Sequence, residues 1–386
     1  MKSVIYNGHI ISPDTEIQCG VVEIEDGMIT AVHQGDAQQV DADKIIDAQG
    51  CYVMPGFVDI HAHGADGKDV CDNEVESVAR IAQRKLGEGV TTWLPTTLTQ
   101  PQARLKQIAA TCREYMAQQQ FVKTPGLHIE GPFINKSKAG AQNPEFVRQP
   151  DWEELKAIHE IAPVLLMSIA PDLPGACECI EQATTAGIVC SAAHSAASYK
   201  EMMAAKHAGL KHLTHFGNAM SGLHHREIGM VGTGLLDPDL KMELICDGFH
   251  LSADFLRLVF SLKPIEQLIL ISDSMSGSWI EKGETELGGL PVVVADGQAR
   301  LKDSGALAGS VLRYNEGLKN IAGLVSLPLQ EIVKTTSWNQ ARSLGLESIG
   351  KIEPGYCADI AILDKEFRVW KTLVDGEDRY HSESSF

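Results

Sequence analysis

Basic residues are scarce in this sequence, in which 33 Lys and Arg stand against 51 Asp and Glu. The formal net charge is therefore −18. A surface of this charge repels nucleic acid and anionic lipid, which need basic patches, so we expect no nucleic acid and no membrane among the partners. One small anionic ligand remains compatible with this charge, because it needs only a local positive site.

Long apolar runs and paired cysteines are also lacking. No stretch approaches the roughly 18 apolar residues that a membrane-spanning helix needs, and the apolar run within Met1–Gly8 is too short for a signal peptide. The nine cysteines include the C-x-C pair Cys177 and Cys179 but no C-x-x-C pair, which argues against a disulfide framework and a zinc ribbon. We therefore expect reduced thiols in a cytoplasmic protein.

The rest of the composition is that of a folded globular protein. The 386 residues are 44% hydrophobic and 22% charged, with 35 Gly and 16 Pro, which excludes a disordered or collagen-like chain. Barrels of repeated strand–helix units form single domains of about 250 residues. The length therefore predicts one large domain with a small companion.

Both ends of the chain have the pattern of short β-strands. The strands expected near the N-terminus are Ser3–Tyr6, Gly20–Glu25, Met28–Val32 and Lys44–Ala48, with turns at Asn7-Gly8, Asp26-Gly27 and Gln49-Gly50. Those expected near the C-terminus are Ala358–Leu363 and Val369–Val374, with a turn at Asp375-Gly376. We infer one small β-sandwich made of residues 1–54 and 354–386. A large domain, residues 55–353, is inserted between them, with junctions at Pro55-Gly56 and Pro354-Gly355.

The middle of the chain alternates strands and helices. Apolar runs that end in polar residues predict eight buried strands, at Phe57–His63, Thr91–Thr96, Gly126–Glu130, Leu165–Ala170, Ile188–His194, His212–His215, Glu243–Asp247 and Leu268–Asp273. Helical patterns lie between most of them, at Glu74–Leu86, Gln102–Gln118, Asp151–Ile161, Gly175–Ala186, Ser198–Ala208 and Ser252–Phe260. Asp151 and Glu154 form a capping-box pattern. This order predicts an α/β fold, a (β/α)8 TIM barrel, with a β-hairpin insertion near 284–301.

Histidines and acids stand at the ends of the predicted strands, where this kind of barrel carries its catalytic groups. The residues in these places are His61, His63, Glu130, His194, His215 and Asp273, and His250 closely follows the seventh strand. Each alone has an ordinary alternative, such as a core histidine or a helix-capping acid. Their joint occurrence at one end of successive strands favours a metal site instead, because imidazole and carboxylate together bind Zn²⁺, Fe²⁺ or a similar ion.

The motifs around these residues resemble the amidohydrolase superfamily and, within it, the N-acetylglucosamine-6-phosphate deacetylase family. The matching segments are Pro55–Gly64, Leu127–Phe133, Lys138–Pro144, Ala192–Ser195, Thr214–Met220, His224–Gly229, Asp247–His250, Ile271–Met275 and Leu307–Ser310. They occur in the family's order and span most of the chain, so the resemblance is specific.

The resemblance implies a role for each group. Glu130, His194 and His215 would hold the main metal, and His61 and His63 a second one bridged by Glu130, so that one or two divalent ions, Zn²⁺ or Fe²⁺, are expected. Asp273 would be the general base and acid, and His250 would hydrogen-bond the acetyl oxygen. The substrate-binding set would be Ala141, Gln142, Asn218, Ala219, Arg226, Asp247, Gly248, His250, Leu307, Ala308 and Gly309. A homodimer is also expected, because a neighbouring subunit often completes the phosphate site in this family.

The chain departs from the family pattern at three positions. Gln142 stands where many members have His, Gly217 where a bulky aromatic residue is usual, and Asp172 where Glu is usual. The first two lie near the expected sugar pocket, which puts the identity of the sugar in doubt.

The function expected from the resemblance is deacetylation of N-acetylglucosamine 6-phosphate to glucosamine 6-phosphate and acetate, in amino sugar catabolism. Three alternatives stay open at the level of the sequence. These are the same reaction on N-acetylgalactosamine 6-phosphate, hydrolysis of another small N-acyl compound, and a catalytically inactive barrel that serves as a scaffold.

Overall fold

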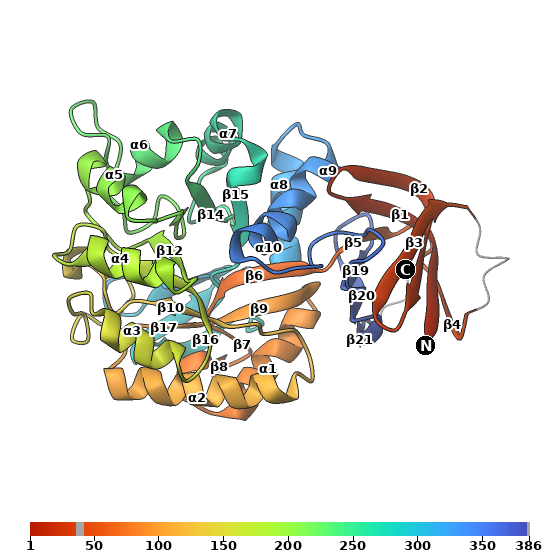
Figure 1. The fold of residues 1–386 in the computed structure, drawn as a ribbon, viewed down its shortest axis with the longest axis horizontal. Coiled ribbons are helices and arrows are strands. Elements are labelled where there is room, and N and C mark those ends of the chain that lie inside the picture. The colour runs from red at the N-terminus through yellow and green to blue at the C-terminus, as the bar shows by residue number, and fades with distance from the viewer. Residues whose placement is uncertain (36–41, 384–386) are drawn as a thin grey trace.

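Strands from both ends of the chain meet in one sheet. The computed structural model describes residues 1–35 and 42–383. In it, the terminal sheet has eight strands in the order β21-β20-β19-β5-β1-β2-β3, with β4 paired to β1. These strands are β1 (Lys2–Ser12), β2 (Thr15–Glu25), β3 (Met28–Gln34), β4 (Lys44–Asp47), β5 (Tyr52–Pro55), β19 (Ile360–Leu363), β20 (Val369–Val374) and β21 (Glu377–His381). The predicted small β domain built from both termini is confirmed, and it lies beside the barrel (Figure 1).

The predicted turn at Asn7-Gly8 is wrong, because β1 continues from Lys2 to Ser12 and includes both residues. The pairing of β1 with β2 shifts register between Ile5 and Gly8, and Asn7 has a φ of 53°. The first half of β1 pairs with β4 and the second half with β5. A Cβ on Gly8 would lie 2.5 Å from Cγ2 of Val53, so the closeness of β5 requires glycine here. The Asn-Gly pair therefore makes a bulge that lets one strand serve two neighbours.

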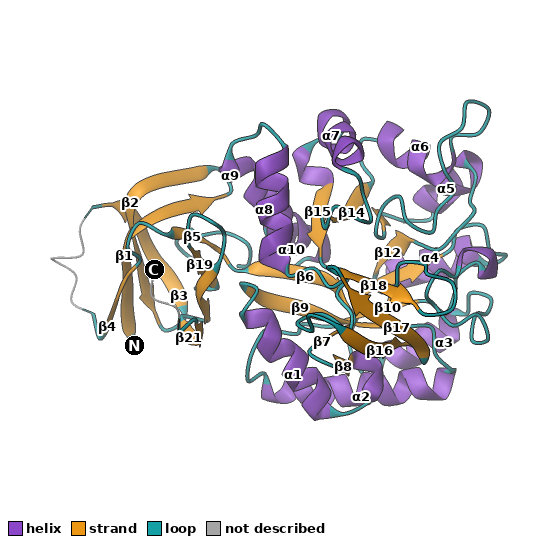
Figure 2. Cartoon of the chain, turned by 180° about the vertical axis from the view of Figure 1, so that it is seen from behind, coloured by secondary structure: helices purple, strands orange, loops and turns teal. Residues whose placement is uncertain are grey.

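The middle of the chain forms the predicted parallel barrel. Its strands follow the order of the sequence and are β6 (Phe57–Ala62), β9 (Val90–Thr97), β10 (Leu127–Glu130), β11 (Val164–Ile169), β12 (Val189–Ala192), β13 (His212–Leu213), β14 (Lys241–Ile245) and β15 (Leu268–Ile271). Helices surround them (Figure 2): α1 (Val75–Leu86), α2 (Gln102–Gln118), α3 (Trp152–His159), α4 (Ala176–Thr185), α5 (Tyr199–His207), α6 (Gly229–Leu236), α7 (Ala253–Leu262), α8 (Tyr314–Leu324), α9 (Leu329–Ile332) and α10 (Trp338–Leu344). All eight strands expected from the apolar runs are present.

The first and last strands close the barrel through few main-chain contacts. The amide of Asp273 donates to the carbonyl of His61 at 2.9 Å, just beyond the end of β15. Deeper in the seam, the buried phenol of Tyr314 lies 2.8 Å from the carbonyl oxygen of Leu270 in β15 and 3.2 Å from that of Val58 in β6. A side chain from α8 therefore bridges the seam where the strands themselves do not pair.

Two local predictions need correction. Asp151 caps α3 by accepting from the amides of Glu153 and Glu154, but the carboxylate of Glu154 bonds Arg148 instead of completing the capping box. The insertion near 284–301 is a three-stranded antiparallel sheet rather than a hairpin, because Gly288-Gly289 supplies a turn in addition to Asp296-Gly297. Its strands are β16 (Gly283–Leu287), β17 (Leu290–Ala295) and β18 (Gln298–Leu301).

Among the described residues, no helix combines the length and the apolar character needed to cross a bilayer.

Candidate metal centre and active site

The candidate metal ligands gather at the carboxyl ends of the barrel strands. Glu130 is the last residue of β10, whereas His194, His215 and Asp273 each stand two residues beyond the end of a strand. These last three have φ values of 42°, 31° and 50°, in the left-handed region that non-glycine residues rarely adopt. The chain therefore turns sharply after each strand, which is a conformation that clusters at functional sites.

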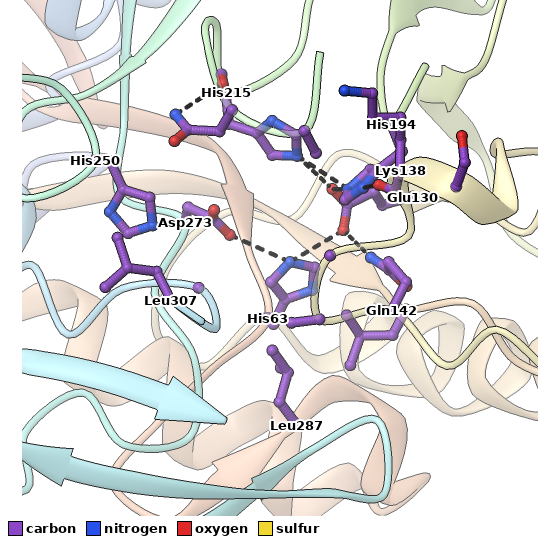
Figure 3. A pocket seen from close by; sticks show the side chains of 17 residues that line it. His63, Glu130, Lys138, Gln142, His194, His215, His250, Asp273, Leu287 and Leu307 are labelled. Carbon is purple, nitrogen blue, oxygen red and sulfur yellow. Dashed lines mark hydrogen bonds and ion pairs between the residues drawn. The ribbon is translucent and has the colours of Figure 1, made fainter. Parts of the chain in front are cut away.

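Glu130, His194 and His215 form one compact group. Oε1 of Glu130 lies 3.2 Å from Nε2 of His194 and 3.1 Å from Nε2 of His215, and the two nitrogens are 3.1 Å apart. All three side chains are at least nine-tenths buried. Figure 3 shows the three side chains pointing toward one another.

His61, His63 and Asp273 form a second group beside the first. The Nε2 atoms of the two histidines are 3.2 Å apart, and each lies 3.4 Å from Oδ1 of Asp273. Glu130 joins the groups, since its Oε2 lies 3.3 Å from Nε2 of His63 and its Oε1 lies 3.5 Å from Nε2 of His61. One carboxylate is therefore placed to bridge two ions.

The hydrogen bonds at the outer edges of the rings test whether divalent ions fit. Nδ1 of His63 lies 3.2 Å from the carbonyl oxygen of Thr96, and Nδ1 of His194 lies 2.9 Å from that of Lys138. A carbonyl only accepts, so each Nδ1 carries the proton and each Nε2 presents a lone pair. Lone pairs and carboxylate oxygens that converge in a buried space are the donor set of Zn²⁺ and Fe²⁺. The residues therefore fit two divalent cations.

The ionisation of the two acids, Glu130 and Asp273, also favours a bound cation. Burial opposes ionisation of Glu130, but His61, His194 and His215 outweigh it and hold the pKa of its carboxyl well below the usual range. Burial likewise opposes ionisation of Asp273, yet the imidazoles of His61 and His63 lower its pKa to about 2. Both acids are therefore carboxylates near neutral pH, and their negative charge favours a cation between the rings.

A cavity of about 340 Å³ opens over these groups, a size suited to a small ligand. Of the predicted substrate-binding residues, those that line it are Ala141, Gln142, Asn218, Ala219, His250, Leu307 and Gly309. Asp273 and four of the metal candidates also line it, and His61 is completely buried and stands outside the lining. The structure therefore brings most of the predicted site to one place.

Four predicted substrate-binding residues do not line the cavity. Asp247 stands behind His250, whose Nδ1 lies 2.7 Å from Oδ2 of Asp247, and Ala308 is packed in the core of the three-stranded insertion. Gly248 lies in the same loop as Asp247 and is also outside the lining. Arg226 is exposed at the tip of a short hairpin closed by His224 and Glu227.

Several lining residues were not singled out from the sequence. Leu98 and Leu287 form an apolar wall, and Lys138 brings a positive charge to the cavity. Nζ of Lys138 donates to the carbonyl oxygen of Met220 at 3.2 Å. The only signal for Lys138 in the sequence is its place at the start of the Lys138–Pro144 motif.

The three departures from the family pattern differ in their position. Gln142 lies in the cavity, but both ends of its amide are used, by Oε2 of Glu130 at 2.5 Å and by the amide of Thr99 at 2.7 Å. Gly217 is outside the lining, and a Cβ there would approach Leu251 at 3.2 Å. The glycine in place of the usual aromatic residue therefore affects packing against the loop before α7 and not the wall of the cavity.

Asp172 ties two of the loops that carry metal candidates. One carboxylate oxygen accepts from Ser195 at 2.5 Å, next to His194, and the other accepts from Asn135 at 2.5 Å, in the loop that follows Glu130. The carboxylate of Asp172 therefore bridges the two loops.

The chain matches the Amidohydrolase family over residues 52–378. It is 33% identical to an N-acetylglucosamine-6-phosphate deacetylase of Lysinibacillus sphaericus, over 93% of this chain and 92% of that protein. It is 32% identical to an N-acetylgalactosamine-6-phosphate deacetylase of Escherichia coli O157:H7, over 92% of this chain and 93% of that protein.

Solved structures agree with these relatives. The N-acetylglucosamine-6-phosphate deacetylase of Thermotoga maritima superposes with a TM-score of 0.89 at 36% identity, covering 98% of this chain and 100% of that one. A variant of the Mycobacterium smegmatis enzyme, in complex with N-acetyl-D-glucosamine 6-phosphate, superposes with a TM-score of 0.92 at 27% identity, covering 98% and 99%. This chain therefore belongs to the amidohydrolase family and, within it, to the N-acetylglucosamine-6-phosphate deacetylase family.

Proposed function

We propose that this chain hydrolyses the acetamide of N-acetyl-D-glucosamine 6-phosphate to glucosamine 6-phosphate and acetate, a step of amino sugar catabolism. The observation that carries the proposal is that Asp273 and the bridging Glu130 lie together on the wall of one cavity. The relatives described above that carry this activity cover nearly the whole chain, which supports the same chemistry here.

Glu130, His194 and His215 would hold one divalent ion, and His61 and His63 a second. Ions bound there would lower the pKa of a water molecule and polarise the acetyl carbonyl, which an unassisted amide requires for attack near neutral pH. Zn²⁺ and Fe²⁺ both suit the ligands, and metal analysis of the purified protein distinguishes between them.

Asp273 is placed to move the proton. Without metal, the imidazoles of His61 and His63 lower the pKa of its carboxyl, so that Asp273 is a carboxylate near neutral pH. It accepts a proton from the attacking water and returns it to the departing amine, so that the C–N bond breaks and acetate leaves with the new C–O bond.

His250 is placed to stabilise the acetyl oxygen. The carboxylate of Asp247 holds its Nδ1 at 2.7 Å, which fixes the ring while the residue lines the cavity. A hydrogen bond from a ring held in this way strengthens as negative charge develops on the oxygen.

The phosphate would be bound at the outer end of the cavity. Asn218 and Ala219 line the cavity, whereas Arg226 lies on an exposed hairpin and does not line the cavity. We therefore propose a homodimer in which Arg226 serves the site of the partner subunit, because a guanidinium pairs with phosphate in a bidentate manner.

Mixed dimers test this arrangement. Asp273→Asn and Arg226→Ala homodimers should each be weak, and subunit exchange between them should restore up to one wild-type site in each mixed dimer. Absence of recovery after verified exchange would show that Arg226 acts within its own subunit or not at all.

An acetate-release assay tests the function itself. The panel consists of N-acetylglucosamine 6-phosphate, N-acetylgalactosamine 6-phosphate, unphosphorylated N-acetylglucosamine and an N-acetyl amino acid, with the metal content measured in the same sample. We expect the first to have the highest kcat/KM. Preference for an unphosphorylated substrate would contradict the phosphosugar assignment.

N-acetylgalactosamine 6-phosphate is the second candidate substrate. The E. coli relative that bears this activity is nearly as similar as the glucosamine enzymes, and the two sugars differ only in the orientation of one hydroxyl. Equal kcat/KM values for the two sugars would remove any claim of specificity.

A cytoplasmic location is also proposed, since all nine cysteines are free thiols.

A further inference from the structure

A buried polar cluster lies inside the barrel, beneath the candidate metal ligands. The interior of such barrels is normally packed with layers of branched apolar residues. Here it also contains several fully buried polar side chains, which are His128, Ser168, Ser191, His212, Thr214 and Glu243. None of them lines the cavity, and the mechanism above uses none of them.

Two members of this region face each other without a hydrogen bond. Nδ1 of His61 and Oε2 of Glu243 are both buried atoms with no partner, and they lie 3.6 Å apart. Both side chains have no exposed surface. An ionised carboxylate oxygen left unpaired in a dry interior is costly, so this approach needs an explanation.

The rest of Glu243 is firmly held. Its Oε1 lies 3.0 Å from Nδ1 of His212 and 3.4 Å from Oγ of Ser191. His212 is fixed in turn by Oγ of Ser343, 2.6 Å from its Nε2. Because Oε1 is occupied, Oε2 is the atom that Glu243 presents to His61.

No other neighbour offers His61 the same contact. His128 packs edge-on against His61, but its own nitrogens lie 3.0 Å from the carbonyl oxygen of Ile60 and 2.8 Å from the hydroxyl of Ser168. His63 and His194 direct Nδ1 to backbone carbonyls. Nδ1 of His215 is buried without a hydrogen-bond partner, and its ion pair with Glu130 is made through Nε2. Within the described residues, His61 is therefore the one metal candidate whose outer nitrogen faces a carboxylate.

We infer that Glu243 is a positioning residue for the second metal site. It accepts the Nδ1 proton of His61, which fixes the ring in the form whose Nε2 presents a lone pair beside His63 and Asp273. A carboxylate behind a ligating imidazole also raises the basicity of that ligand. The inference rests on the proposed metal-dependent function, and it makes the second ion, rather than the first, dependent on Glu243.

Metal titration tests the inference independently of activity. Metal-free wild-type protein, Glu243→Gln and Ser343→Ala are titrated with Zn²⁺ against a competing chelator, and with Co²⁺ followed by its visible absorption. Ser343→Ala is the matched control, because it removes a hydroxyl from the far end of the same chain of contacts and leaves His61 and Glu243 intact.

We expect wild type and Ser343→Ala to bind two ions. Glu243→Gln should bind the first ion normally and the second one about 10- to 100-fold more weakly. Unchanged binding of both ions by Glu243→Gln would overturn the inference. Equal weakening of both ions, or a wild-type protein that binds only one, would overturn it as well.

A crystal structure of the metal-loaded wild-type protein covers the case in which Glu243→Gln does not fold. We expect Nε2 of His61 on the metal and Nδ1 within about 3.2 Å of Oε2 of Glu243. Coordination through Nδ1, or a separation above about 3.5 Å, would refute the inference. Absence of acetate release with normal two-ion binding would instead contradict only the proposed function.

Discussion

The side-chain amide of Gln142 donates to Oε2 of Glu130 at 2.5 Å, while its oxygen accepts from the backbone amide of Thr99 at 2.7 Å. The residue is 4% exposed, so both contacts are shielded from water. Gln142 therefore links the carboxylate of Glu130 to the loop that follows β9, whereas the family resemblance implies a contact with substrate.

Gln142→Ala separates these two roles. If Gln142 orients Glu130, kcat should fall about 10- to 100-fold, because the carboxylate proposed to bridge the metals loses an outer hydrogen bond. Steady-state kinetics on N-acetylglucosamine 6-phosphate measure this. A rise in KM with unchanged kcat would identify Gln142 as a substrate contact instead.

Asp273→Asn removes the proposed proton carrier. We expect kcat to fall about 10²- to 10⁴-fold, since an amide cannot accept the proton of the attacking water. The metal content should be measured in the same sample, and the ion held by Glu130, His194 and His215 should remain. A variant that retains more than a tenth of wild-type kcat with its metal in place would rule out the role.

Tyr314→Phe tests the bridge across the barrel seam. The change removes a buried hydroxyl from between the carbonyl oxygens of Val58 and Leu270 and leaves the ring in place. We expect the free energy of unfolding to fall by about 1–3 kcal/mol, the cost of unsatisfied buried groups. Urea denaturation measures it, and a change below 0.5 kcal/mol, on the scale of a surface substitution, would show that the seam does not need the hydroxyl.

Buried His128 should make the metal-free protein sensitive to acid. Burial and the neighbouring His61 lower the pKa of His128 from 6.5 to about 3. Between pH 6.5 and about 3, His128 is protonated in the unfolded chain but neutral in the folded chain. The free energy of unfolding therefore decreases as the pH falls below 6.5.

His128→Asn should therefore flatten this pH dependence. Asn keeps a donor for the carbonyl oxygen of Ile60 but does not titrate. Denaturation of wild type and His128→Asn, both with chelator, at pH 8, 6.5 and 5 gives the comparison. Glu243 has its pKa lowered from 4.5 to about 2, so it changes the free energy of unfolding mainly below pH 5. Parallel slopes for the two proteins would contradict the assignment to His128.

Chelation should lower the thermal stability as well as the activity. Ions that bind only the folded chain add RT ln(1 + [metal]/Kd) to its free energy of unfolding. The folded chain loses this contribution when a chelator removes the ions from the carboxylates and imidazoles. Differential scanning calorimetry with and without chelator measures the shift in Tm, and added Zn²⁺ should reverse it. An unchanged Tm would indicate that the site does not hold metal in the purified protein.

The strands and most helices of the barrel were predictable, because each depends on apolar periodicity within one short segment. The strand at Leu127–Glu130 is an example, since four buried residues followed by Gly-Pro mark both its course and its end. The helices α6, α8, α9 and α10 were missed. In α6, six of eight residues are buried, so it lacks the polar face on which helical periodicity depends.

The sequence by itself determined that histidines and acids stand at the ends of successive parallel strands, and hence that they share one mouth. Only the tertiary structure decided what stands behind and around them: the approach of Glu243 to His61, the hold of Gln142 on Glu130, and the place of Arg226 outside the cavity. The physical reason is that strand periodicity is a local property of a few neighbouring residues. Contacts such as that of His212 with Ser343, 131 residues apart, depend on how the barrel closes and which side chains its closure turns inward.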